Sequence, residues 1–341
     1  MKAWYKPYKL QFKSPVLTSR GSMSVKNGYY LYISDGKHTG IGECSYIEGL
    51  SNDDFNNYEQ ALMDLCDGIE ASDASKMPDL NRFPSISFGF ETAMIDLHNG
   101  GERILFDTEF THGHAAIPIN GLVWMGDKDF MLQQIEQKLR DGFKCIKIKV
   151  GAIDFDEEVK LLAYIRERYT PEQIEIRLDA NGAFGKRDAL LKLERLSKFN
   201  IHSIEQPIKP KQWELMHTLS REQIIPIALD EELIGIKVID IDELLTFIHP
   251  QYIILKPSLL GGLNVCDEWI KKSTNLNIGW WATSALESNI GLNAIAQWVY
   301  THSQNVVQGL GTGSLYTNNI PSPLVVQNGT LRYDPNTKWS V

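Results

Sequence analysis

The sequence predicts an α/β protein: a barrel of alternating strands and helices, preceded by a smaller α+β domain. Three observations predict this fold class. From about residue 115 onward, short apolar runs alternate with amphipathic helical stretches. Before that point, antiparallel strand patterns give way to helical ones. The apolar runs of the second part also carry polar residues at alternate positions, which is typical of strands around a polar interior.

The first 110 residues are expected to form the α+β domain. Residues 28–34 read as a strand that ends at the polar segment 35–37, and residues 39–44 read as the next strand. We therefore expect an antiparallel meander over residues 1 to 55. From about residue 53 to 100, apolar residues recur three and four apart, which predicts helices. The sequence contains no low-complexity linker, so the two domains are expected to pack tightly.

Residues 111–319 are expected to form a modified TIM (β/α) barrel, because they contain eight apolar runs, the number that closes such a barrel. The tail, residues 320–341, lacks this rhythm and is expected to return to the first domain and pair with it. The eight runs span residues 115–121, 145–150, 174–181, 202–207, 225–231, 252–258, 278–288 and 305–313.

Composition excludes several classes of function. With 34 basic and 43 acidic residues, the formal charge is −9, so a nucleic acid or an anionic membrane has no electrostatic attraction to the chain. The four cysteines are scattered without a CxxC pair, which favours a reducing compartment. No secretory signal and no run of roughly 20 apolar residues is present. We expect a cytoplasmic protein that acts on a small molecule, as a monomer or a homo-oligomer.

Successive strands direct polar side chains toward one interior. In the run 145–150, Lys147 and Lys149 share one face, and the aliphatic residues share the other. The aliphatic face must pack on the surrounding helices, so the polar face points into the barrel. The residues expected on this inner face are Lys147, Lys149, Arg177, Asp179, Ser203, Glu205, Asp230 and Lys256.

Three acidic residues of this set predict a metal site. Asp179, Glu205 and Asp230 follow one another at intervals of 26 and 25 residues, each at the carboxyl end of its run. That rim carries the catalytic residues of such barrels. Converging carboxylates raise one another's pKa, and a divalent cation relieves the repulsion. Oxygen ligands alone favour Mg²⁺, with Mn²⁺ as a substitute.

Lysines beside such a cation suit the removal of a proton from the carbon next to a carboxylate. The negative charge of the resulting enediolate needs stabilisation, which a divalent cation supplies as a Lewis acid. Lys149 can act as the base if nearby positive charge lowers its pKa toward roughly 7 to 8. Lys147, Lys256 and the cation are expected to supply that charge.

Taken together, these residues resemble the enolase superfamily, in particular its muconate-lactonizing subgroup. The matching motifs are KxK at Lys147 and Lys149, DxN at Asp179, EQP at Glu205, DE at Asp230 and KPS at Lys256. The resemblance covers nearly the whole chain, since the α+β part matches the family's capping domain. It implies that Asp179, Glu205 and Asp230 bind the metal, and that Asn181 and Glu231 surround these ligands.

Within the subgroup, residues 283–288 (TSALES) and 309–316 (GLGTGSLY) are most similar to the o-succinylbenzoate synthases of menaquinone biosynthesis. The related dipeptide epimerases carry an Asp-x-Asp motif where this chain has residues 311–313 (GTG), so the resemblance implies a substrate without an α-ammonium group. The implied reaction is the syn dehydration of 2-succinyl-6-hydroxy-2,4-cyclohexadiene-1-carboxylate.

The resemblance also implies a role for each residue. Lys149 would remove the α-proton and return it to the leaving hydroxyl. Lys256 would stabilise the enediolate from the opposite side, and Lys147 would hold the carboxylate. The residues expected to bind the rest of the substrate are Ser284, Gly311, Gly313 and, from a loop of the capping domain, Arg20.

Two other functions stay open at this point. An N-acylamino acid racemase or epimerase of the same subgroup would use the same two lysines as opposed bases. A metal-stabilised barrel that only binds a small acid is the non-enzymatic alternative, although binding alone does not require a lysine on each side. His112 and His114, in a polar loop without further nearby ligands, are expected to be surface residues rather than metal ligands.

Overall fold

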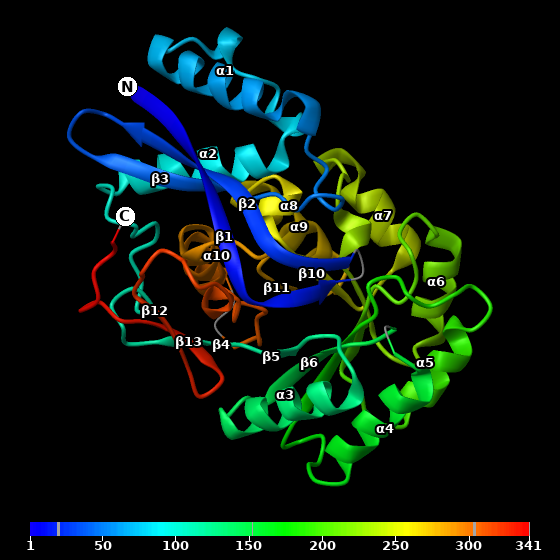
Figure 1. Cartoon of the computed structure of the whole chain (residues 1–341). Helices are drawn as coiled ribbons and strands as arrows, with labels where there is room; N and C mark the ends of the chain where they lie inside the picture. Colours follow the sequence, from blue (N-terminus) through cyan, green and yellow to red (C-terminus); the bar gives the residue numbers. More distant parts are fainter. Residues whose placement is uncertain (19–20, 152, 303–304, 341) are drawn as a thin grey trace.

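The structure of the protein is a computed structural model that describes residues 1–18, 21–151, 153–302 and 305–340. Figure 1 shows an antiparallel sheet with two helices lying beside a barrel of strands and helices. The N-terminal sheet has the order β1-β2-β3, so the expected meander is confirmed. Its elements are β1 (Lys2–Thr18), β2 (Gly21–Ser34), β3 (Thr39–Cys44), α1 (Tyr58–Ala71) and α2 (Pro84–His98).

Over the residues that the structure describes, the barrel contains seven parallel strands in sequential order. The strands are β5 (Gly121–Val123), β6 (Cys145–Lys149), β7 (Glu175–Asp179), β8 (Ser203–Glu205), β9 (Ile227–Leu229), β10 (Tyr252–Leu255) and β11 (Gly279–Ala282). Helices surround them: α3 (Lys128–Arg140), α4 (Phe155–Arg166), α5 (Ala189–Ser197), α6 (Trp213–Glu222), α7 (Ile241–Ile248), α8 (Pro257–Leu260), α9 (Leu263–Asn275) and α10 (Asn289–His302). The α/β barrel with an α+β capping part is thus confirmed as the fold class.

The eighth apolar run closes the ring without forming a strand over its described residues. Gln308 bridges to Ile119 and Gly309 bridges to Thr283, both in parallel orientation. Closure here needs a glycine, because a Cβ on Gly309 would lie 2.4 Å from Thr283 Oγ1. A side chain at residue 309 would therefore have to displace the side chain of Thr283.

The first run and the tail differ from our expectation. The first run splits: β4 (Ala116–Pro118) leaves the barrel, and β5 begins at Gly121. The tail forms a hairpin of β12 (Leu324–Gln327) and β13 (Thr330–Tyr333), and β13 pairs with β4 rather than with the N-terminal sheet. The rest of the tail still reaches that sheet, since Ile320 and Trp339 pack against a cluster of Tyr30 and Ile41.

Alternation along the barrel strands separates two apolar layers. The outward residues, such as Ile148, Leu178 and Leu229, are buried together with the helices in the main core. Inside the barrel, Ala228, Ile254 and Trp281 form a separate cluster. Because these inward residues precede the polar rim along their strands, they fill the interior below it, and the charged side chains gather at the carboxyl ends of the strands.

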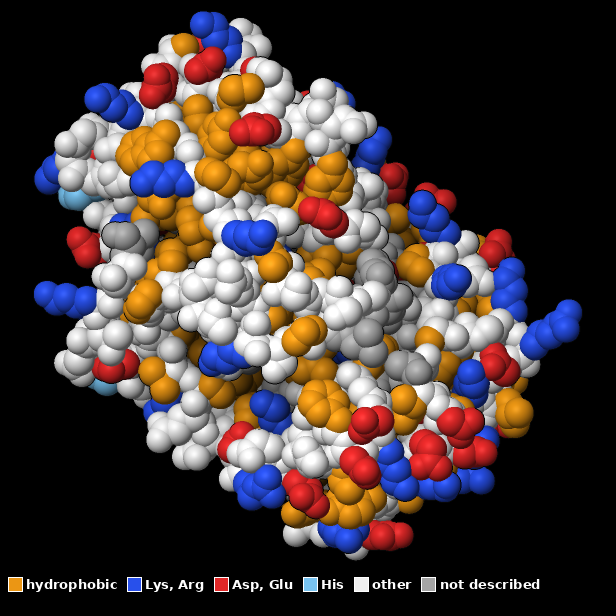
Figure 2. Space-filling view, viewed as in Figure 1, with side chains coloured by type: hydrophobic (Ala, Val, Ile, Leu, Met, Phe, Trp, Pro, Cys, Tyr) orange, Lys and Arg blue, Asp and Glu red, His pale blue; other side chains and the backbone are white. Residues whose placement is uncertain are grey.

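Three further features concern the helices, the cysteines and the surface. Among the described residues, no helix is both long and apolar enough to cross a membrane. All four cysteines are buried and free. On the face shown in Figure 2, charged side chains of both signs are interspersed.

Candidate active site

The predicted catalytic residues lie together at the carboxyl end of the barrel. The strand register aligns Lys149 of β6 with Asp179 of β7, and Asp179 with Glu205 of β8. Asp230 and Lys256 follow β9 and β10 directly. The three acids are almost fully buried. The parallel strands therefore bring the acids and lysines to one place, as the spacing predicted.

Lysines connect the three carboxylates. Lys147 Nζ lies 2.9 Å from Asp179 Oδ2 and 2.5 Å from Glu205 Oε2. Lys149 Nζ also lies 2.9 Å from Asp179 Oδ2, and Lys256 forms an ion pair with Asp230. The carboxylates are thus neutralised by ammonium groups from two sides, Lys147 and Lys149 on one side and Lys256 on the other.

The crowded charges shift the pKa values in opposite directions. Burial and the neighbouring Asp179 raise the pKa of Glu205 well above its usual range. Burial alone would also raise the pKa of Asp179, but Lys147 and Lys149 hold it below its usual range. Burial would lower the pKa of Lys147, yet Asp179 and Glu205 raise it above its ordinary value. These shifts show that the carboxylates depend strongly on nearby positive charge.

Asn181 links Lys149 to Glu231. Its Oδ1 accepts a hydrogen bond from Lys149 Nζ at 2.6 Å, and its Nδ2 donates to Glu231 Oε1 at 3.0 Å. Asn181 has φ +43°, a left-handed conformation that asparagine tolerates better than most residues. Asn181 therefore holds the amine of Lys149 directly, and Glu231 holds Asn181.

The site suits a divalent cation by its donor atoms. Asp179, Glu205 and Asp230 offer only carboxylate oxygens, the ligands that Mg²⁺ prefers. Glu205 Oε1 is buried and accepts no hydrogen bond from any residue that the structure describes. Lys256 Nζ lies 4.0 Å from this oxygen, beyond hydrogen-bond distance, and a buried acceptor without a hydrogen bond is rare. The lysines lie between the acids here, and the ligand atoms of the three acids do not all come within 4.8 Å of one another.

A cavity of about 1040 Å³ opens beside the lysines. Both parts of the chain line it: Met23, Ile47 and Leu50 come from the N-terminal part, and Trp124 and Leu286 come from the barrel. The predicted substrate-binding residues Ser284, Gly311 and Gly313 also line it. Arg20, the remaining one, lies outside the described residues.

Ser284 is already engaged in a buried network. Its hydroxyl donates to Glu287 Oε2 at 2.5 Å and accepts a hydrogen bond from Thr312 Oγ1 at 2.7 Å. Glu287 also accepts a hydrogen bond from Ser258, two residues after Lys256. The network therefore connects the loops after β10, β11 and the eighth run.

Sequence reasoning missed three residues of this region. Glu287 lies within the TSALES segment, but its contacts join loops that are distant in the sequence. Glu232 accepts hydrogen bonds from Trp213 Nε1 at 2.9 Å and Lys211 N at 2.7 Å. It therefore anchors the loop after β8. Glu43 of β3 accepts hydrogen bonds from Ser288 N and Gly291 N at the start of α10. For Glu43, the only signal in the sequence is an acidic residue within an apolar run.

Comparison with known proteins decides the family. The family described as "Enolase C-terminal domain-like" matches residues 131–337, and "MenC, N-terminal domain" matches residues 2–97. The o-succinylbenzoate synthase of Desulfotalea psychrophila is 44% identical over 97% of this chain and 98% of its own length. The chain belongs to the o-succinylbenzoate synthase family. The resemblance read from the sequence motifs is thereby confirmed, and the chain is an enzyme of the lyase class.

Solved structures agree with this assignment. The crystal structure of MenC from Desulfotalea psychrophila superposes with a TM-score of 0.88 at 42% identity, over 97% of this chain and 99% of that one. The o-succinylbenzoate synthase of Thermosynechococcus elongatus, crystallised with Mg in the active site, gives a TM-score of 0.75 at 23% identity, over 91% and 92% of the two chains. At that identity the second likeness concerns the fold alone.

Proposed function

We propose that this enzyme dehydrates 2-succinyl-6-hydroxy-2,4-cyclohexadiene-1-carboxylate to o-succinylbenzoate in menaquinone biosynthesis. One observation carries the proposal: Lys149 and Lys256 flank three buried carboxylates from opposite sides at the mouth of the barrel. A site that only bound an acid would not need an amine on each side. The 44% identity with an o-succinylbenzoate synthase over nearly the full length supports the same reaction.

Asp179, Glu205 and Asp230 are the residues that would hold the divalent cation, which we propose to be Mg²⁺ with Mn²⁺ as a substitute. Their oxygen donors support this choice, because carboxylate oxygens are the ligands that Mg²⁺ and Mn²⁺ prefer. When bound, the cation supplies the positive charge that stabilises the carboxylate as it becomes an enediolate.

Lys149 carries the proton in both halves of the proposed reaction. Its amine removes the proton from the ring carbon that bears the carboxylate, and the electrons of the C–H bond move onto that carboxylate. The electrons then return to form the ring double bond, and the C–O bond of the neighbouring hydroxyl breaks. Lys149 gives its proton to the leaving hydroxyl, so water departs and an aromatic ring remains. One residue serves both steps because hydrogen and hydroxyl leave from the same face.

The other residues hold the reacting groups. Lys256 stays protonated and lies across from Lys149, where its charge stabilises the enediolate and contacts the face of the ring. Burial would lower the pKa of Lys256, but Asp230 and Glu205 raise it, which keeps the ammonium form. Lys147 binds the carboxylate side, and Asn181 and Glu231 fix the amine of Lys149.

Binding of the succinyl group involves the far side of the cavity. We propose that backbone amides near Gly311 and Gly313 bind its carboxylate, with Arg20 from the capping part. Ser284 shapes this wall, and its hydroxyl becomes a donor to substrate only if its hydrogen bond to Glu287 opens.

We also propose that residues 1–110 with the tail 320–341 act as the capping domain, that residues 111–319 act as the barrel domain, and that the enzyme works in the cytoplasm.

An activity assay with two substrates tests this function. Purified protein with Mg²⁺ is mixed with 2-succinyl-6-hydroxy-2,4-cyclohexadiene-1-carboxylate, and formation of o-succinylbenzoate is followed by absorbance and chromatography. We expect rapid dehydration. In parallel, an N-succinylamino acid is tested for inversion by polarimetry. Inversion of this compound with no formation of o-succinylbenzoate would overturn the proposal in favour of a racemase.

A further inference from the structure

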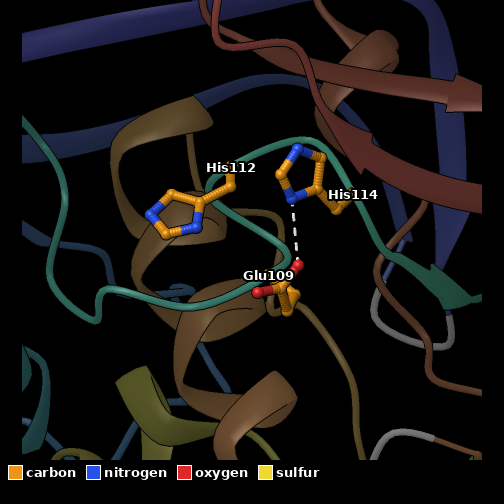
Figure 3. A group of neighbouring side chains, drawn as sticks. All are labelled: Glu109, His112 and His114. Carbon is orange, nitrogen blue, oxygen red and sulfur yellow. Dashed lines mark hydrogen bonds and ion pairs between the residues drawn. The ribbon is translucent and has the colours of Figure 1, made fainter.

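A second group of metal-ligating side chains lies outside the barrel mouth. Glu109, His112 and His114 belong to the segment that joins α2 to β4. One ligand atom from each lies within 4.8 Å of the other two, and no other such group occurs among the residues that the structure describes. Figure 3 shows the two imidazole rings on either side of the Glu109 carboxylate. The sequence alone indicated no third ligand beside His112 and His114, and the fold brings Glu109 next to them.

The backbone of this segment holds the three side chains in place. His112 N donates to Thr108 O at 3.1 Å, and His114 N donates to Glu109 O at 2.9 Å. Phe110 is fully buried and anchors the turn in the main core. Gly113 closes the turn at φ +78°, where an added Cβ would lie 2.8 Å from Pro335. The backbone of this turn therefore needs little further ordering when the side chains bind a ligand.

The hydrogen bond of His112 matches that of a metal ligand, and His114 lies beside the Glu109 carboxylate. His112 Nε2 lies 2.6 Å from Asp107 Oδ1. A carboxylate in that position commonly orients a metal-binding histidine, and it leaves Nδ1 for the metal. His114 Nδ1 lies 3.0 Å from Glu109 Oε2. Two ligands of one ion, each about 2.1 Å from it, stand about 3.0 to 3.4 Å apart, so this pair needs little movement to share an ion.

We propose that Glu109, His112 and His114 form a surface site for a transition-metal ion, with Zn²⁺ as the representative probe. Two imidazoles and one carboxylate suit Zn²⁺ and its neighbours in the first transition row, whereas Mg²⁺ prefers oxygen ligands. The side chains of His114 and Glu109 are 70% and 64% exposed, so water completes the coordination. The site is chemically distinct from the barrel carboxylates and lies where the capping part joins the barrel.

Calorimetric titration with zinc chloride tests the site in the presence of saturating Mg²⁺, which occupies the barrel carboxylates. The full-length, untagged enzyme is compared with the double variant His112→Ala/His114→Ala. The matched control is His38→Ala/His98→Ala, which removes two histidines from other parts of the surface. We expect one zinc equivalent to be lost or weakened at least tenfold in the double variant and retained in the control.

Glu109→Gln provides a second test that leaves both histidines in place. We expect it to weaken zinc binding severalfold, because an amide oxygen is a poorer ligand than a carboxylate. Zinc isotherms of the double variant and Glu109→Gln that equal that of the unchanged enzyme would overturn the proposal. Dehydratase activity with Mg²⁺ is measured on every variant and is expected to be unchanged, so failure of this site is distinguishable from failure of the proposed function.

Discussion

At the scale of single residues, the position of the Lys149 amine is set by two neighbours of different kinds. Asp179 is a charged acceptor, and Asn181 is a neutral one whose own orientation is fixed by Glu231. The carbonyl of Asn181 must face Lys149, because its amino group is the only part that can donate to a carboxylate. The spacing of the motifs predicted these residue types at the rim, but the hydrogen-bonded chain among them depends on side-chain geometry.

Replacing Lys149 by alanine is expected to lower kcat at least about 10³-fold, since the residue acts as both base and acid. The fold should persist, because the carboxylates keep Lys147 and Lys256 as partners. Turnover, Mg²⁺ affinity by calorimetry and far-UV circular dichroism are compared with those of Lys160→Ala, which changes an exposed lysine on α4. Residual dehydration above a few per cent of the normal rate would refute the assigned base.

A buried carboxyl in the capping part is expected to make stability depend on pH. Burial raises the pKa of Asp53 from its ordinary value of 3.8 to about 6, and its Oδ2 accepts no hydrogen bond from the described residues. The folded state therefore holds this proton more tightly than the unfolded state. The contribution of Asp53 to the free energy of unfolding is therefore present below about pH 4 and is lost as the pH rises from about 4 to 6.

The variant Asp53→Asn tests this loss. Asparagine keeps the oxygen that accepts from Ser85 N and Oγ, but it carries no charge. Relative to this variant, the unchanged enzyme should lose about 2 to 3 kcal/mol of unfolding free energy between pH 4 and pH 7. Urea unfolding across this range measures the difference, with Asp67→Asn as an exposed control. Parallel stability curves for the enzyme and Asp53→Asn would contradict the assignment.

At the scale of elements, two carboxylates of the capping part bind the amino ends of barrel helices. Glu43 of β3 accepts from Ser288 N and Gly291 N at α10, and Glu91 of α2 accepts from Leu263 N and Asn264 N at α9. A carboxylate at the amino end of a helix accepts hydrogen bonds from the free N–H groups there, and its negative charge interacts favourably with the helix dipole. The contacts of Glu43 fix the end of the loop after β11, and residues of this loop line the cavity.

The two glutamates should therefore differ in importance according to their burial. Glu43→Ala leaves Ser288 N, Gly291 N and the Tyr8 hydroxyl without their acceptor in a fully buried place, so we expect a loss of about 3 to 5 kcal/mol. Glu91→Ala should cost about 1 to 2 kcal/mol, as for an ordinary helix cap. Urea unfolding measures both, with the exposed Glu59→Ala as control. Equal stabilities for Glu43→Ala and Glu59→Ala would reject this role.

An element can be predicted from the sequence when it is determined by residues close to it in the chain. Alternation of Lys147 and Lys149 with isoleucines is local, so β6 and its inward face were predictable. The split of the first run at residue 119 and the pairing of β13 with β4 depend on contacts over about 200 residues, and no local pattern encodes them. The same applies to the closure at Gly309, where the close approach to the Thr283 side chain arises only in the folded barrel.

At the scale of the whole molecule, the barrel brings together charged side chains whose burial is unfavourable unless they form ion pairs. Four buried acids, Asp179, Glu205, Asp230 and Glu231, face three lysines at the rim. A buried charge cluster costs free energy unless it is paired, and the lysines pair it only in part. The motif spacing predicted which residues converge. Only the folded structure shows that Lys147, Lys149 and Lys256 form ion pairs with the acids that would bind the cation.

Removing the divalent cation is therefore expected to separate activity from folding. Dialysis against EDTA should abolish dehydration and leave the far-UV circular dichroism unchanged, since the lysines still neutralise most of the acidic charge. The unfolding free energy should fall by about 3 to 4 kcal/mol relative to protein in Mg²⁺ at 100 to 1,000 times Kd. Returning Mg²⁺ alone should restore both activity and stability, which excludes a requirement for the surface site. Full turnover by the metal-free enzyme would show that Asp179, Glu205 and Asp230 serve the lysines alone.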